Sequence, residues 1–200
     1  MVIINSNTNK DLQYNQFSGL DRANRCIVDY LFNNAPDLWR LLYYTDKQPL
    51  FQPLLTTEQK SNMIAKDYTI DNITTTKNIL FITETDETFS VAIPQIRIDI
   101  GDVLPINSYQ SAVEIIFQII IPNKLHIIQT EYNDVATRGI AIFRELAKAL
   151  NGRRIDNSGF NSPLFMNRKA PEGVGRNNGA KKIAFNKHYK GYWVSFSVLI

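Results

Sequence analysis

Residues 94–129 contain two long runs of alternating side chains, which constrain the fold more than any other feature of the sequence. In the first run, 95–100, every even position is isoleucine and every odd position is polar. In the second run, 112–121, every odd position is apolar, whereas the even positions mix apolar and polar residues. A period of two predicts two strands, each with one face in a core. Residues 101–108 are rich in turn-forming types, so we expect an antiparallel ribbon.

Helical patterns lie on both sides of this ribbon. Residues 18–70 contain capping boxes at 18–21 and 56–59, and a proline at position 36 that suits the first turn of a helix. Residues 133–152 predict a longer helix. Its charged members are expected to face solvent: Arg138, Arg144, Glu145 and Lys148.

The predicted fold is α+β, with a twisted, mainly antiparallel sheet, one long helix packed on it, and two or three short helices before it. We expect one domain, 18–200, in which 18–70 is the helical N-terminal part and 78–200 is the sheet-and-helix core. Residues 1–17 are rich in asparagine and lack a periodic pattern, which predicts a flexible arm. The final run, 192–200, alternates again and predicts a last strand.

Composition limits the class of protein. The chain has 44% hydrophobic and 20% charged residues, as globular proteins do. The start shows no signal-peptide pattern, and the longest near-apolar run, 115–121, is too short to cross a bilayer. The single cysteine, Cys26, excludes an internal disulfide. A soluble protein of the cytoplasm is the default expectation.

Positive charge is concentrated near the C-terminus. Residues 153–190 hold nine basic and two acidic residues, a net charge of +7, whereas the whole chain carries +3. Within this segment, 168–182 is rich in Gly and Asn and predicts a mobile loop. The candidates to face DNA or a partner are Arg168, Lys169, Arg176, Lys181 and Lys182. Tyr189, Tyr192 and Trp193 could add stacking surfaces. Strand packing is the plainer interpretation for Tyr192, and both interpretations stay open for Trp193. For the basic segment as a whole, a solvated loop is the alternative.

Catalytic residues are scarce. The two histidines, His126 and His188, lie in different predicted elements, and no Cys or His spacing is typical of a metal site. The glycine-rich stretch 173–179 lacks the Gly-Lys-Ser/Thr ending of a phosphate loop. Asp99 and Asp102 could act as paired carboxylates in metal-dependent cleavage of nucleic acid, but Asp99 is more simply the outward residue of a strand. We therefore expect no enzyme activity, no cofactor and no metal site.

The order of elements resembles that of the neck proteins of tailed bacteriophages, the head–tail connector and tail-terminator group. The resemblance covers about residues 20–200. It is carried by seven segments: DLWRLLYY (37–44), LTTEQK (55–60), IPQIRIDIGDVLPIN (93–107), EIIFQIIIPNKLHII (114–128), RELAKALNGRRI (144–155), GFNSPLFMNR (159–168) and KGYWVSFSVLI (190–200).

This resemblance implies a structural virion protein that is assembled in the cytoplasm of the host bacterium. Such subunits form rings, often of six or twelve copies, between the portal and the tail, and packaged DNA passes through the lumen. A ring needs heterologous interfaces. The candidates for these contacts are the even face of 112–120 and the final strand, with Trp193, Phe196 and Val198 as inter-subunit residues. A nucleic-acid-binding module that uses residues 153–190 is the alternative.

Overall fold

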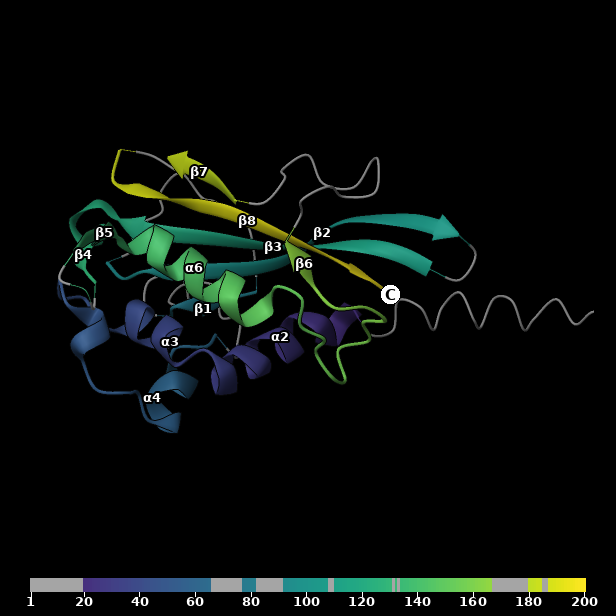
Figure 1. The fold of residues 1–200 in the computed structure, drawn as a ribbon, viewed down its shortest axis with the longest axis horizontal. Helices are drawn as coiled ribbons and strands as arrows, with labels where there is room; N and C mark the ends of the chain where they lie inside the picture. Colours follow the sequence, from purple (N-terminus) through teal and green to yellow (C-terminus); the bar gives the residue numbers. More distant parts are fainter. Residues whose placement is uncertain are drawn as a thin grey trace, which may run out of the picture.

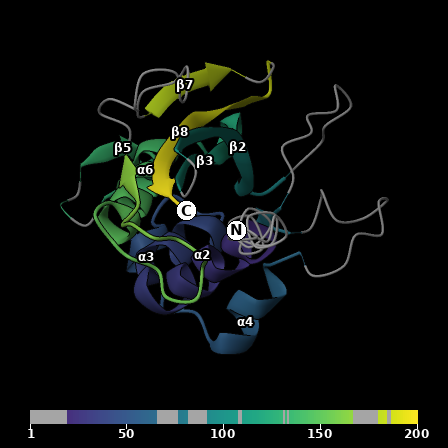
Figure 2. The same cartoon turned by 90° about the vertical axis from the view of Figure 1, so that its right-hand side faces the viewer.

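The computed structural model describes residues 20–65, 77–81, 92–107, 110–130, 132, 134–166, 180–184 and 187–200. It has the predicted α+β architecture, in which a curved, mainly antiparallel sheet is covered on one side by helices (Figures 1 and 2). The predicted arm, 1–17, lies outside the described residues.

The larger sheet is built around the ribbon formed by β2 (Gln95–Asn107) and β3 (Gln110–Pro122). The last strand, β8 (Tyr189–Leu199), pairs antiparallel with β3, which therefore lies in the middle of the sheet. Three short strands complete it: β1 (Ile79–Leu80) parallel to β2, and β6 (Phe165–Met166) and β7 (Ala180–Ala184) antiparallel to β8. A separate two-stranded sheet pairs β4 (Ile127–Gln129) with β5 (Val135–Thr137).

The hydrophobic core lies between the odd face of β3 and the helices. The five odd-numbered residues 113–121 are completely buried, and the rings of Phe117 and Phe196 meet edge to face with centroids 5.6 Å apart. Helix α2 (Leu20–Asn34), helix α3 (Pro36–Tyr43) and helix α6 (Arg138–Leu150) bury their apolar faces in the same core. The period of two in the sequence therefore identified the core face correctly.

The N-terminal helices begin where local chemistry favours a helix start. Pro36 occupies the first turn of α3, where its missing N–H has no intrahelical partner to lose. Helix α4 (Thr57–Asn62) has the predicted capping box, because the Thr56 side chain accepts from the Gln59 amide and the Gln59 side chain accepts from the Thr56 amide. Short 3-10 turns, η1 (Pro49–Phe51) and η2 (Asn123–Leu125), connect other elements.

The long helix, α6 (Arg138–Leu150), begins later than predicted. Its N-cap is Thr137, and residues 135–137 form β5 instead of the first helical turn. The prediction that four charged residues face solvent is half wrong. Arg144 and Lys148 are exposed, but Arg138 and Glu145 are buried because this side of the helix lies against α3 and the loops around it.

The central ribbon is longer than the turn residues indicated. Strand β2 continues through 101–107, so Gly101 and Asp102 do not form a turn. The register shifts between Ile100 and Val103, where one extra residue forms a β-bulge. A Cβ atom on Gly101 would come within 2.5 Å of Ile116 Cδ1, so only glycine fits this bulge without displacement.

The even face of β3 is also buried, which corrects the prediction that it contacts a neighbouring subunit. Glu114, Gln118 and Ile120 are each at most 5% exposed. Arg97 and Gln95 of β2 lie on the same face and are buried as well. Alternation along β3 therefore separates a purely apolar layer from a mixed polar layer, and neither layer is solvent-facing.

Candidate interaction surfaces

The best-defined cationic surface lies at one corner of the sheet, where β7 and the start of β8 meet. Lys181 and Lys182 are exposed on β7, and Lys190 is exposed on β8 opposite Ala184. The predicted loop therefore ends earlier than position 182, because 180–184 form a strand with pairs such as Lys181 opposite Trp193. We call Lys181, Lys182 and Lys190 the basic edge.

His126 borders this basic edge. Burial lowers the pKa of its imidazole below the ordinary value, and the positive charges of Lys190 and Lys182 lower it further. Its backbone carbonyl accepts a hydrogen bond from Arg138 N at 2.8 Å, which places it at the start of α6. Two of the three lysines, Lys182 and Lys190, therefore lie near an imidazole whose neutral form is favoured.

The other predicted contact residues have different outcomes. Arg168, Lys169 and Arg176 lie outside the residues that the structure describes. Phe196 and Val198 are buried in the core, at 0% and 2% exposure, so the prediction that they form inter-subunit contacts is wrong. Both belong to the inner face of β8, which packs toward α6 and the N-terminal helices.

Trp193 lies on the opposite, mixed face of the sheet and is half-buried. It pairs in register with Gln118 of β3 on one side and with Lys181 of β7 on the other. Gln118 is in turn opposite Arg97 of β2. One row of side chains therefore crosses four strands, in the order Arg97, Gln118, Trp193 and Lys181. Trp193 thus connects the interior of the mixed layer to the basic edge.

The opposite edge of the sheet carries acidic and exposed apolar residues. Strand β1 covers β2 only at Ile96 and Arg97, and β2 then extends to its tip at Asn107. Along this extension Asp102 is exposed, and Val103 and Ile106 are 37% and 46% exposed. We call residues 101–107 the β2 extension; it projects at the far right of the sheet in Figure 1.

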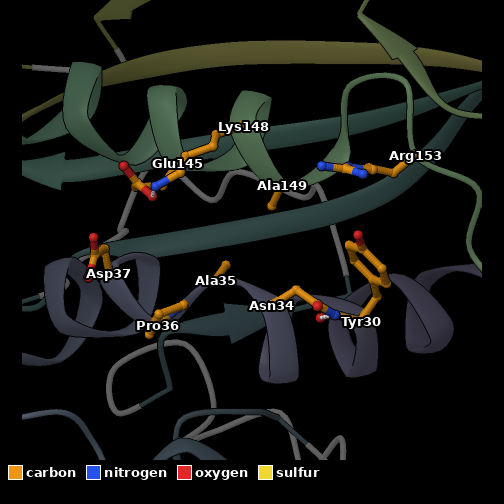
Figure 3. A pocket seen from close by; sticks show the side chains of 9 residues that line it. All are labelled: Tyr30, Asn34, Ala35, Pro36, Asp37, Glu145, Lys148, Ala149 and Arg153. Carbon is orange, nitrogen blue, oxygen red and sulfur yellow. Dashed lines mark hydrogen bonds and ion pairs between the residues drawn. The ribbon is translucent and has the colours of Figure 1, made fainter.

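A groove of about 320 Å³ lies between α6 and the N-terminal helices. Figure 3 shows Asp37 and Glu145 at one end and Tyr30 and Arg153 at the other. The buried Glu145 carboxylate lies 3.6 Å from Lys148 Nζ, and Asp37 pairs with Arg40. Both carboxylates of the groove therefore have a cationic partner, and its lining includes no histidine or cysteine.

Arg138 is completely buried, whereas the sequence pattern predicted that it faces solvent. It donates to four backbone carbonyls, from Leu125 and from three residues around the end of α3: Leu41, Tyr44 and Asp46. Burial lowers the pKa of its guanidinium to about 10. Periodicity did not reveal it, because an arginine at a helix start normally extends into solvent.

The two carboxylates of the enzyme alternative both lie on β2 but differ in exposure. Asp99 is half-buried and Asp102 is exposed, on either side of the Gly101 bulge. Within the described part of the chain, no group of three His, Cys, Asp or Glu side chains could hold a metal ion. None of its helices is both long enough and apolar enough to cross a membrane.

These features define an α+β protein with a mixed sheet layer, a basic edge and a projecting β ribbon. Residues 35–198 match the model of the YomW family, and the chain belongs to this family. The family is associated with SPbeta-type phages and Bacillus prophages, so the chain is a phage-related protein. No curated protein and no solved structure matches the chain.

Proposed function

We propose that this chain is a structural virion protein that forms a ring in the head–tail connector, or neck, of a tailed bacteriophage. The ring joins the portal to the tail and surrounds the DNA channel. Membership in a phage-associated family, over residues 35–198, is the observation that carries the proposal. The more specific assignment to the neck is supported by the resemblance of the same elements to phage neck proteins.

The geometry is consistent with a role in assembly. The two carboxylates of the groove, Asp37 and Glu145, each have a cationic partner, which suits a structural groove better than a site poised for chemistry. The sheet, in contrast, presents a long β2 extension with exposed apolar residues on one side and a lysine-rich strand on the other. Exposed strand edges and exposed apolar side chains of this kind commonly form contacts between subunits.

The proposal is tested by a stop codon in the gene of a phage that encodes this chain. If the protein forms a neck ring, lysates of the mutant contain DNA-filled heads and separate tails that do not join. Supplying the intact chain from a plasmid restores whole virions, which controls for effects on neighbouring genes. Normal virions from the mutant would contradict the proposal.

Binding to nucleic acid is the second candidate, and the basic edge favours it. Lys181, Lys182 and Lys190 are all exposed, and the charges of Lys190 and Lys182 lower the pKa of His126. Affinity for DNA falls as salt concentration rises. Each lysine that contacts a phosphate makes the slope of log affinity against log salt concentration steeper by about 0.9.

Replacing all three lysines by serine is therefore expected to weaken DNA binding and to reduce that slope by about 2 to 3. The matched control replaces three exposed cations elsewhere: Arg144, Lys148 and Arg154. Equal affinity and equal slope in both variants would exclude this second function.

A further inference from the structure

The two edges of the larger sheet carry charges of opposite sign. The edge at β2 is acidic, because the β2 extension contains the exposed Asp102 and follows Asp99. On the other side, the basic edge presents Lys181 and Lys182 from β7. Among the strands that the structure describes, none pairs with the outer side of the β2 extension or with the outer side of β7.

Charges on an edge strand normally prevent unwanted sheet pairing. Here the sign differs between the two edges, so the effect depends on which edges meet. Two β2 extensions repel each other, and two β7 strands repel each other, whereas β2 and β7 attract. The charges therefore oppose a symmetric dimer and favour a contact between two different edges of successive copies.

We propose that the β2 extension of one copy adds to β7 of the next copy, so that the sheets of neighbouring subunits join edge to edge. The occupant of each edge is thus a second copy of this chain. This contact rests on the proposed ring function and specifies how the ring is closed. Backbone hydrogen bonds between the two strands would supply most of the affinity. The pairing of Asp102 with Lys181 or Lys182 would determine which edges meet.

The positions of the two edges add a geometric detail. Strand β7 pairs with residues 190–194 of β8, whereas the β2 extension lies level with the far end of that strand, because its partner Ala112 is opposite Leu199. Joining the edges therefore shifts each copy along the strand direction relative to the previous one. A stagger of this kind is what closing a sheet into a barrel requires.

The exposed apolar residues fit this contact. Val103 and Ile106 lie on the β2 extension, beyond the part of β2 that β1 covers. In an edge-to-edge contact they would be covered by the neighbour. A solitary subunit leaves them in water.

Two charge-reversed variants of the full chain test the proposal. The first, Asp102→Lys, makes both edges basic, and the second, Lys181→Glu with Lys182→Glu, makes both edges acidic. All three residues are exposed, so the variants are expected to fold. Arg154→Glu and Asp156→Lys, also exposed, are the matched controls.

Assembly is measured by mass photometry over a range of protein concentrations. Each reversed variant alone should need at least about tenfold more protein than the unchanged chain to assemble, because like charges meet at the contact. An equal mixture of the two should assemble again, because every contact between unlike variants pairs opposite charges. The controls should assemble like the unchanged chain.

The outcomes separate this contact from the proposed function. If the unchanged chain forms rings and the reversed variants do so equally well, the edge contact is wrong and the ring function stands. If the variant with Lys181→Glu and Lys182→Glu loses DNA binding but assembles normally, the basic edge serves nucleic acid and the edge contact is again wrong. If the unchanged chain stays monomeric at every concentration, both proposals are overturned.

Discussion

Arg138 Nη1 donates a hydrogen bond to the carbonyl oxygen of Leu41 at 2.7 Å, which ties the start of α6 to the last turn of α3. The final carbonyls of a helix have no intrahelical donor, so an arginine can satisfy them and its charge is favourable there. The same side chain also reaches Tyr44 O and Asp46 O, so it fixes the chain that leaves α3. One buried residue thus connects the N-terminal helices to the sheet-and-helix core.

Replacing Arg138 by alanine should strongly destabilise the protein. Four backbone carbonyls would lose their donor, and the expected loss in the free energy of unfolding is about 3–5 kcal/mol. Arg138→Lys should recover only part of the lost stability. The planar guanidinium of arginine reaches four acceptors, whereas the compact ammonium group of lysine has only three donors. Urea denaturation measures the difference, with the exposed Arg144→Ala as control. A loss below about 1 kcal/mol would contradict the assigned role.

The pKa of His126 should be lower than the ordinary value of 6.5 in the folded protein. The unfolded chain then binds more protons between the folded pKa and 6.5, so His126 reduces stability as pH falls through this window. The chain has only two histidines, so NMR titration with a His188→Gln variant assigns the His126 signal. Lys182→Gln and Lys190→Gln should each raise this pKa. An unchanged titration in both variants would show that the lysines are not close.

Phe196 should behave as a core residue and not as a contact residue. Phe196→Ala removes a fully buried ring that packs against Phe117, so the expected loss is about 3–5 kcal/mol of unfolding free energy. Tyr132→Ala, at a side chain that is 83% exposed, is the control and should change stability by less than about 0.5 kcal/mol. Equal stability of the two variants would contradict the described packing of β8.

Gly139 should be required for the packing of α6 on β8. A Cβ atom there would lie 2.8 Å from Tyr192 Cε2, so Gly139→Ala is expected to cost about 1–3 kcal/mol despite the better helix propensity of alanine. In a Tyr192→Leu background the clash is smaller, and the same substitution should become nearly neutral. A double-mutant cycle measures this coupling. Additive effects would show that Tyr192 does not lie over Gly139.

Local patterns predicted most of the fold. The alternation in 112–121 identified the core face of β3, and the capping box at Thr56 and Gln59 identified α4, because both signals are set by neighbouring residues. Turn chemistry was less informative. Gly101 and Asp102 form a bulge and not a turn, since strand pairing with β3 continues past them.

Properties that depend on distant contacts could not be predicted. The burial of Arg138 and Glu145 results from the packing of α6 beside α3, which no local pattern encodes. The basic edge was recognised as positive charge but assigned to a loop. Only the pairing with β8 places Lys181 and Lys182 on a strand, and only the tertiary fold brings Lys182 and Lys190 near His126.

Electron cryo-microscopy of the virion of a phage that encodes this chain tests the central proposal most directly. We expect a closed ring of identical subunits between portal and tail, and the α+β fold described for this chain should fit its density. Density at the neck that this fold cannot fit, or the absence of the chain from the purified virion, would contradict it.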